Sequence, residues 1–304
     1  MQLKEKNLLV VLGPTASGKT TLGVNLADRF GGEIISADSR QVYRGLDIGA
    51  GKDLDEYLLA GKKIPYHLID VAELDTVYSV FDFQQQFYQT FEALIDKRVM
   101  PVMVGGSGLY VEAVLEGYQM VAVPENKQLR EELAGLNKAE LESKLRSLKS
   151  DLHNTTDLVS RETLLRAIEI AVFSHGRAPE PAPEIKALVL GTRFERAELR
   201  KRIEERLAQR LEIGLIEEVE GLRAQGVSFE RLDSLGLEYR FVADLIQKKI
   251  NSRDELFEKL SAAIAKFAKR QLSWFRRMER RGIEIHWIEQ ASFEEACKVV
   301  ELNC

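Results

Sequence analysis

A glycine-rich stretch near the beginning of the chain has the residue types and spacing of a phosphate-binding loop. It runs from Gly13 to Thr20 and satisfies the pattern G-x-x-x-x-G-K-[ST]. An apolar run precedes it and a helical pattern follows, so backbone N–H groups and a helix dipole can surround phosphate oxygens. Lys19 can reach the outer phosphates, and the Thr20 hydroxyl can hold Mg²⁺. The motif predicts a phosphate ligand but leaves open a nucleoside triphosphate or a diphosphate ester.

A carboxylate follows the second apolar run, where a strand is expected to end. The run Ile34-Ile35-Ser36-Ala37 leads into Asp38, and ligands of open α/β sheets bind outside this edge. Asp38 could therefore act as a general base or hold Mg²⁺ through water. Alternatively, it caps the following turn, as Ser39 also could. Asp70 ends a further apolar run and is a candidate for either magnesium binding or structural capping.

A second glycine-rich turn, at residues 105–110, follows the apolar run 99–104. Glycines between a strand and a helix allow the backbone to approach an anion closely, and Ser107 adds a hydroxyl. A plain turn is the alternative. Because a phosphate-binding loop is expected in the same sheet, we favour a second phosphate contact at Ser107.

A parallel sheet is required to bring these loops together. Short apolar runs at 7–12, 33–37, 99–104, 185–190 and 283–288 alternate with helical patterns such as 19–30 and 81–95. This alternation predicts an α/β fold with a mostly parallel, P-loop NTPase-like sheet and helices on both faces. After Glu195 the pattern is almost entirely helical. An apolar stripe there predicts buried core and is formed by Leu199, Ile203, Leu207 and Leu211.

The pattern divides the chain into three regions. Residues 1–123 form the expected P-loop α/β core. Residues 124–178 form a helical insertion, because 127–149 is charged, lacks proline and repeats leucine at 141, 145 and 148. Three prolines within Pro179–Pro183 predict a linker, and residues 179–304 return to the core and continue as a helical C-terminal region with a basic helix.

Charge is distributed unevenly along the chain. The 304 residues include 43 Lys and Arg against 48 Asp and Glu, a formal net charge of -5, which excludes a uniformly basic coat. A local basic stretch lies between 262 and 281, with Gln271, Trp274 and Phe275 interleaved; its basic residues are Lys266, Lys269, Arg270, Arg276, Arg277, Arg280 and Arg281. Such a stripe suits an RNA backbone. The alternatives are a merely solvated helix face and, for Trp274 and Phe275, burial in the core.

Several classes of protein are disfavoured. The two cysteines, Cys297 and Cys304, lack the spacing of a zinc site or a disulfide framework, which favours a reduced cytoplasmic chain. No apolar run approaches the ~20 residues that cross a bilayer, so we expect no membrane contact. The sequence contains no [NT]-K-x-D stretch, which argues against a GTPase.

Together, the motifs resemble those of the bacterial tRNA dimethylallyltransferase (tRNA isopentenyltransferase) family. The matching stretches, in the family's order, are GPTASGKT at 13–20, DSRQVYRGLDIGAGK at 38–52, HLID at 67–70, GGSGLY at 105–110 and KRQLSWFRR at 269–277. The resemblance implies transfer of a dimethylallyl group from dimethylallyl diphosphate to N6 of adenosine 37, beside the anticodon of tRNAs reading UNN codons. Diphosphate is released.

The resemblance also implies roles for particular residues. Asp38 would be the general base, and Lys19 and Ser107 would be catalytic by helping to bind the departing diphosphate. The diphosphate would bind to the P-loop residues Gly13, Thr15, Ala16, Ser17, Gly18, Lys19 and Thr20, with Arg202 and Arg206, which are spaced to share one helix face. The alternatives for the two arginines are contact with a tRNA phosphate and a merely solvated helix face. Thr20 would hold Mg²⁺. The tRNA anticodon stem-loop would contact Ser39, Gln41, Tyr43, Arg166, Lys269, Arg270, Gln271 and Arg276, and we expect a monomer.

A few positions depart from the family pattern. Ser107 replaces the usual threonine, and D-I-G-T-A-K-P reads here as D-I-G-A-G-K-D, with Ala50, Gly51 and Asp53 at the changed positions. Tyr66 stands in place of the first of two histidines, and the later G-Y-[RK] stretch lies within Gly236–Arg240 as G-L-E-Y-R. Other functions remain open: a P-loop kinase of small molecules or nucleotides, prenylation of free adenine nucleotides, and a non-catalytic RNA-binding protein.

Overall fold

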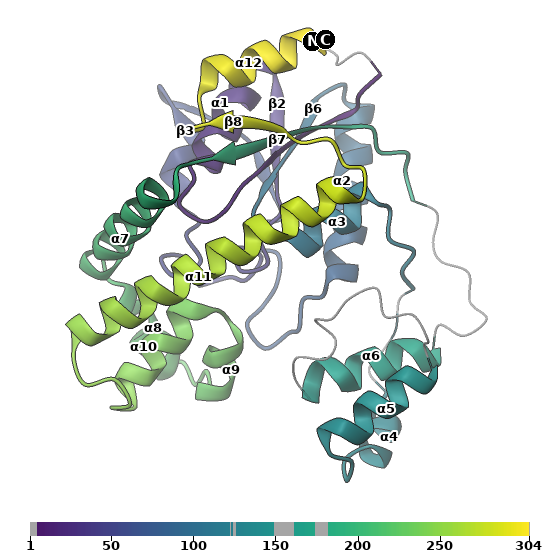
Figure 1. Cartoon of the computed structure of the whole chain (residues 1–304), viewed down its shortest axis with the longest axis vertical. Coiled ribbons are helices and arrows are strands. Elements are labelled where there is room, and N and C mark those ends of the chain that lie inside the picture. Colours follow the sequence, from purple (N-terminus) through teal and green to yellow (C-terminus); the bar gives the residue numbers. More distant parts are fainter. Residues whose placement is uncertain (1–4, 122, 124–125, 149–160, 174–181, 304) are drawn as a thin grey trace. The chain divides into compact units, whose positions relative to one another are not determined.

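The computed structural model describes residues 5–121, 123, 126–148, 161–173 and 182–303 (Figure 1). The chain forms two compact units, Met1–Gly117 with Pro183–Cys304, and Tyr118–Ala182. The predicted helical insertion, 124–178, lies within the second unit. Most of the expected proline linker, 179–181, lies outside the described residues, as does Cys304.

A parallel sheet forms the centre of the larger unit. Its strand order is β5-β2-β6-β1-β7-β8, and every neighbouring pair in it is parallel. The strands are β1 (Leu8–Leu12), β2 (Gly32–Ser36), β5 (Tyr66–His67), β6 (Met100–Gly105), β7 (Ala187–Arg193) and β8 (His286–Glu289). The predicted parallel sheet is confirmed. A separate antiparallel pair, β3 (Leu58–Leu59) and β4 (Lys62–Lys63), follows the short 3-10 helix η1 (Leu54–Tyr57).

Both faces of the sheet are covered, as the continuous apolar strands require. Leu9 and Val11 of β1 pack into a cluster with α1 (Lys19–Phe30) and α12 (Phe293–Leu302). The alternate residues of β1 pack into the opposite cluster with α2 (Val80–Asp96), α3 (Gly108–Leu115) and the end of α11 (Arg253–Arg280). The loops after β1, β2 and β6 therefore meet at one edge of the sheet.

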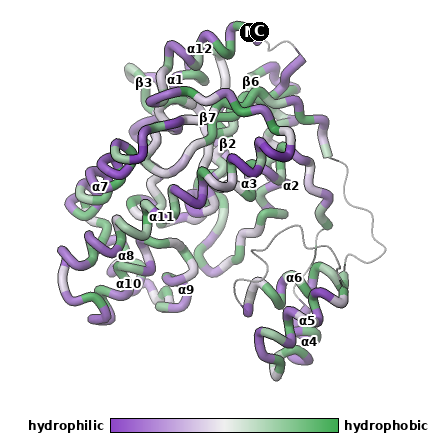
Figure 2. The backbone as a smooth tube through the Cα atoms, in the orientation of Figure 1, coloured by the Kyte–Doolittle hydropathy of each residue, from purple (hydrophilic) through white to green (hydrophobic). Residues whose placement is uncertain are grey.

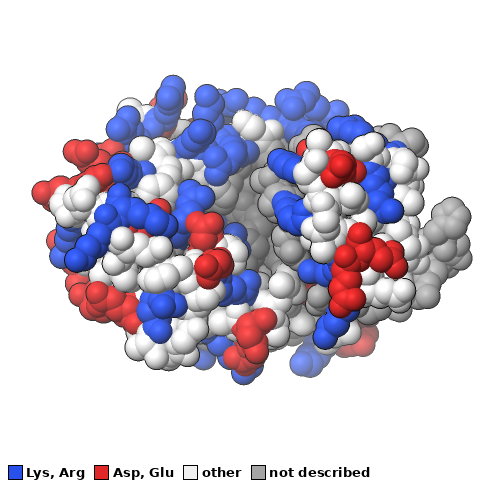
Figure 3. Space-filling model, turned by 90° about the horizontal axis from the view of Figure 1, so that it is seen from below, with Lys and Arg blue, Asp and Glu red and all other residues white. Residues whose placement is uncertain are grey.

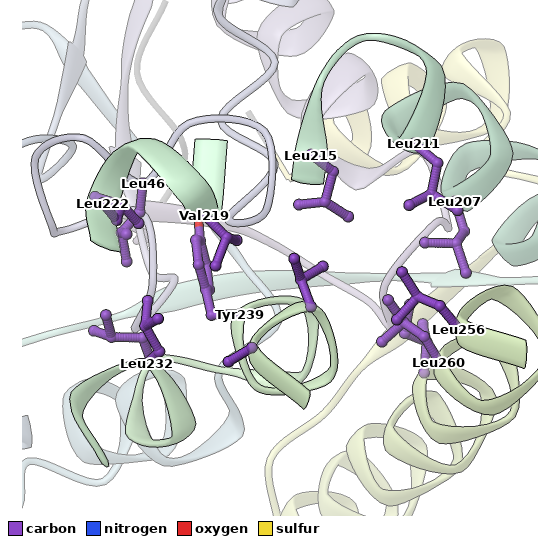
Figure 4. Packing of buried hydrophobic residues seen from close by; sticks show 14 of the residues in the cluster. Leu46, Leu207, Leu211, Leu215, Val219, Leu222, Leu232, Tyr239, Leu256 and Leu260 are labelled. Carbon is purple, nitrogen blue, oxygen red and sulfur yellow. The ribbon is translucent and has the colours of Figure 1, made fainter. Parts of the chain in front are cut away.

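A helical region follows β7 in the larger unit. It contains α7 (Arg196–Glu212), α8 (Leu215–Ala224), α9 (Phe229–Ser234), α10 (Leu237–Ile246) and α11. The predicted stripe of α7 is buried, with exposed fractions of 2–6%. Figure 4 shows Leu207 and Leu211 of α7 facing Leu256 and Leu260 of α11. In Figure 2, α7 and α11 alternate between hydrophilic and hydrophobic residues, as expected for helices with one buried face.

The smaller unit is helical where it is described. It contains α4 (Lys127–Glu132), α5 (Lys138–Leu148) and α6 (Arg161–Phe173). Leu141 and Leu145 are buried with Leu164 and Ile168 of α6, whereas Leu148 is 45% exposed. None of the described helices of either unit combines the length and apolarity needed to cross a membrane.

Candidate active site

The P-loop joins β1 to α1 and is shaped by contacts with β7. Gly18 has φ +69° at the start of α1, a conformation that favours glycine. The Ser17 hydroxyl is buried, donates to the Pro14 carbonyl at 2.8 Å, and shares a 2.6 Å hydrogen bond with Thr192 of β7. A Cβ atom at Gly13 would collide with the Thr192 and Ser17 side chains. The loop is therefore held by the sheet, and Ser17 contributes shape.

Lys19 lies in this loop with its ammonium group close to the backbone. Its Nζ donates to the Pro14 carbonyl at 3.3 Å. The pKa of Lys19 is lowered to about 8, chiefly by burial; the negative charge of Asp38 opposes this shift, and the positive charge of Arg206 contributes to it. Lys19, Asp38 and Arg206 thus lie within electrostatic reach of one another.

Asp38 and Ser107 lie at the ends of neighbouring strands. Asp38 follows β2, and its Oδ1 accepts the backbone N–H of Arg40 at 2.9 Å. Ser107 follows β6, and its Oγ accepts the N–H of Ser39 at 2.9 Å. The capping contact considered for Asp38 is therefore present, and it coexists with a place in the site because Asp38 lines the cavity described next.

A cavity of about 850 Å³ joins these elements. Its walls include the P-loop, the ends of β2 and β6, and residues of α7, α10 and α11. The predicted site residues on its walls are Thr15, Ala16, Ser17, Gly18, Lys19, Thr20, Asp38, Ser39, Gln41, Ser107, Arg202, Arg206, Arg270 and Gln271. One cavity therefore brings together a phosphate-binding loop, a carboxylate and several cations, a set that suits a reaction at a phosphate ester.

The arginines of α7 reach the cavity by different contacts. Arg202 donates from Nε to the Ala16 carbonyl of the P-loop at 2.9 Å and lies over the Phe194 ring. Arg206 pairs with Asp53, and Arg210 lies 3.3 Å from the same carboxylate. These contacts hold the Asp53 carboxyl pKa below its usual range, although burial opposes the shift.

Gln271 of α11 bridges two loops of the site. Its Oε1 accepts the Thr15 N–H of the P-loop at 2.9 Å, and its Nε2 donates to the Gly106 carbonyl at 2.8 Å. The side chain is 8% exposed. A Cβ atom at Gly106 would collide with it, and one at Gly105 would collide with the Ala37 backbone. In this structure Gly105, at the end of β6, and Gly106 therefore permit close packing between parts of the protein.

Two of the predicted tRNA contacts next to Asp38 are largely occupied within the protein. Gln41 is 8% exposed; its Nε2 donates to the Gly51 carbonyl at 2.9 Å and its Oε1 accepts the Ser36 hydroxyl. Tyr43 is 4% exposed, and its hydroxyl accepts the N–H of Tyr78. Gln41 borders the cavity, whereas Tyr43 belongs to a hydrophobic core.

Arg166 lies in the smaller unit and is bound there. It pairs with the buried carboxylate of Glu169 at 3.2 Å and donates to the Val123 carbonyl at 2.6 Å. Asp70, considered for magnesium or capping, pairs with the buried Lys52, which also contacts Asp47 at 2.7 Å. Asp70 thus has a structural partner.

The basic stretch lies on α11 and separates into two sets. Arg277 and Arg281 bind the fully buried carboxylate of Glu112 on α3, at 2.5 and 3.0 Å. The remaining members, which like Arg281 are exposed, are Lys266, Lys269, Arg270, Arg276 and Arg280. Phe275 is core, and Trp274 packs against Gly108 under the Arg277 guanidinium. Figure 3 shows both signs of charge on the face seen from below, with no uniformly basic coat on that face.

Many residues that line the cavity were not among the predicted site residues, and three charged ones among them are Arg210, Asp53 and Glu238. Arg210 follows Arg202 and Arg206 at the same spacing of four residues, so the sequence alone could have placed it on the same helix face. Asp53 and Glu238 stand at positions that depart from the family pattern, but their proximity to Arg210 depends on the fold. Burial raises the pKa of Glu238, against the charge of Arg210.

The site also offers the groups expected around a phosphate-bound magnesium ion. Thr20 lines the cavity beside Lys19, and Asp38 lies on the same walls. Among the described residues no group of three or more His, Cys, Asp or Glu side chains could hold a metal ion. A P-loop magnesium is held by one hydroxyl together with phosphate oxygens, so Thr20 fits that role.

The parallel sheet and the cavity at the P-loop define an α/β protein of the P-loop class. The family model described as IPP transferase matches residues 41–278. The chain belongs to the IPP transferase family.

Curated relatives and solved structures agree with this family and with the fold. The chain is 52% identical to tRNA dimethylallyltransferase 1 of Geotalea uraniireducens over 299 residues, 98% of each chain. It is 53% identical to tRNA dimethylallyltransferase 1 of Syntrophus aciditrophicus over 292 residues, 95% of each. A tRNA isopentenylpyrophosphate transferase from Bacillus halodurans matches with a TM-score of 0.68 and 29% identity, over 99% of this chain and 95% of that one. The predicted family and fold class are confirmed.

A more distant solved structure is similar in fold alone. It is a eukaryotic dimethylallyltransferase acting on tRNA, with a TM-score of 0.72 and 19% identity, over 94% of this chain and 74% of that one.

Proposed function

We propose that this protein transfers a dimethylallyl group from dimethylallyl diphosphate to N6 of adenosine 37 in tRNAs reading UNN codons. The observation that carries the proposal is that Asp38 and a P-loop line one cavity. The relatives named tRNA dimethylallyltransferase support the same reaction for this chain. Because tRNA is the acceptor, the cytoplasm is the proposed location.

The chain's own groups divide the reaction between them. The bond between N6 and the allylic carbon forms as the carbon–oxygen bond to the diphosphate breaks, and the electron pair leaves with the diphosphate. Asp38 accepts the N6 proton. Lys19, the P-loop amides and Arg202 stabilise the negative charge that develops on the leaving group. Mg²⁺, held by Thr20, would neutralise part of the same charge when it is bound.

The exposed basic residues of α11 supply the proposed contact with tRNA. Arg270 lines the cavity, and Lys269 is its exposed neighbour. Phosphate neutralisation by lysine and arginine provides much of the affinity for RNA. The anticodon stem-loop would therefore lie along α11, with the target adenosine displaced into the cavity toward Asp38.

Incubation with radiolabelled dimethylallyl diphosphate, Mg²⁺ and unmodified tRNA, followed by nucleoside analysis, tests the proposal. Label on N6 of the adenosine beside the anticodon is the expected result. Label on AMP or ADP would instead identify a free nucleotide as acceptor. Consumption of ATP without transfer to tRNA would indicate a kinase. Binding of tRNA with none of these reactions would leave a non-catalytic RNA-binding protein.

A further inference from the structure

The Asp53 carboxylate lies inside the cavity against two cations of α7. Its Oδ2 contacts Nη2 of Arg206 and lies 3.3 Å from Nη2 of Arg210. The side chains of Asp53 and Arg206 are each about one-third exposed, whereas that of Arg210 is 9% exposed. The Asp53 carboxylate thus binds Arg206, which faces the same cavity as the P-loop.

The backbone that carries Asp53 is firmly held. The Glu218 carboxylate accepts three backbone N–H groups, from Asp47, Ile48 and Gly49, at 2.6–3.1 Å. Nearer to Asp53, the Gly51 carbonyl accepts Nε2 of Gln41. Because this loop is fixed at several points, we expect the long side chain of Arg206, and not Asp53, to move when the two separate.

We propose that Asp53 competes with the diphosphate of the donor and of the product for Arg206. The inference rests on the proposed function, because it assigns a diphosphate to the P-loop. Carboxylates and phosphates offer a guanidinium the same kind of charge-assisted hydrogen bond, so one can replace the other. Without diphosphate, Asp53 holds Arg206; when the diphosphate binds, Arg206 turns to it.

Arg210 lowers the free-energy cost of this exchange, because it keeps a cation beside Asp53. It remains near the carboxylate after Arg206 has moved, so Asp53 is not left as an unpaired charge in a partly buried position. Arg210 is itself nearly buried, and its Nε has no hydrogen-bond partner among the described residues. Arg210 is therefore confined beside Asp53, while Arg206 is free to alternate.

The consequence is a limit on how tightly diphosphate is held. Donor and product share the diphosphate group, so an arginine bound permanently to it would slow product release as much as it favoured donor binding. Asp53 recovers Arg206 as the product leaves. The contact between Asp53 and Arg206 therefore lowers the affinity of the site for diphosphate, which favours release of the product.

Binding of inorganic diphosphate with Mg²⁺, measured by calorimetry on the whole chain, tests this. The variant Asp53→Asn keeps the side-chain size and removes the charge. Since the pair is about one-third exposed, we expect about five-fold tighter binding. In an Arg206→Ala background, Asp53→Asn should give no further tightening. Asp53→Ala, which removes the carboxylate without putting an amide in its place, should tighten diphosphate binding as Asp53→Asn does.

A matched control separates competition from a general charge effect. Asp55 lines the same cavity, is exposed and has no ion-pair partner among the described residues. Asp55→Asn should leave the affinity within two-fold of the parent chain. Equal tightening in Asp55→Asn, tightening that persists without Arg206, or unchanged or weaker binding in Asp53→Asn would each overturn the inference. Failure of the parent chain to bind diphosphate would instead refute the proposed donor site.

Discussion

Replacing Gln271 by leucine should damage two loops of the site at once. Gln271 bridges the Thr15 N–H and the Gly106 carbonyl from a position that is 8% exposed. Leucine keeps most of the volume but leaves both backbone groups without a partner. An unsatisfied buried group costs about 1–3 kcal/mol, so with two such groups the free energy of unfolding should fall by about 2–6 kcal/mol. The separation of the P-loop from the loop after β6 should also change.

Urea unfolding and steady-state kinetics measure the two effects. Small displacements of positioning groups reduce rates by about 10- to 100-fold, so kcat/KM for the donor should fall by that factor. Gln271→Glu provides a sharper comparison, because a carboxylate still accepts the Thr15 N–H but cannot donate to Gly106. The stability of this variant should fall because the carboxylate repels the Gly106 carbonyl and because a charge is buried, while the contact with Thr15 is kept. Gln225→Leu, at an exposed helix end, is the matched control and should change neither quantity.

One result would refute this reasoning about Gln271. If Gln271→Leu unfolds at the parent urea concentration and raises only the KM for tRNA, then the amide does not organise the phosphate loops. That outcome would instead support the role of Gln271 as a tRNA contact, which the family resemblance implied.

Three further predictions concern the chemistry and the two substrates. Asp38→Ala should lower kcat by about 10²- to 10⁴-fold while the Kd for tRNA, measured by filter binding, stays nearly unchanged; equal loss of both would show a structural role. The pKa of Lys19 is about 8, so affinity for diphosphate should fall as the pH rises through 8, where Lys19 loses its charge. Lys19→Arg should remove that fall in calorimetric titrations between pH 6.5 and 9.5, and a fall that persists in the variant would assign it to another group. Replacing Lys269 and Arg270 by alanine should weaken tRNA binding and reduce the slope of log Kd against log salt by about 2, whereas Lys248→Ala, at an exposed charge in the turn after α10, should change neither.

The sheet was largely predictable from the sequence because its strands are short apolar runs between glycine-rich turns. The predicted runs at 7–12, 33–37 and 99–104 match β1, β2 and β6 within one or two residues. The strand predicted at 283–288 begins later, at His286, because β8 pairs only with the second half of β7. Periodicity detects apolar residues, but it does not reveal which of them have a partner strand.

Local motifs located the phosphate-binding loop, but they could not predict which partners the charged residues of α11 would contact. The P-loop pattern placed Lys19 and Thr20 on the cavity, where the structure has them. The basic run on α11 looked uniform in sequence, yet Arg277 and Arg281 bind the buried Glu112. Side chains of one charge therefore divide between those that bind a buried carboxylate and those that face solvent, according to helix face, which depends on what packs against the helix.

The least predictable feature is the contact of Asp53 with Arg206 and Arg210, because it joins residues more than 150 positions apart. In the sequence, Asp53 is one changed letter in a familiar stretch and Arg210 is one more charge on a helix. In the structure they meet because the P-loop sheet and the helical region share one cavity. A departure from a family motif is therefore best interpreted together with the residues that it contacts, since here the new carboxylate already has a cation opposite it.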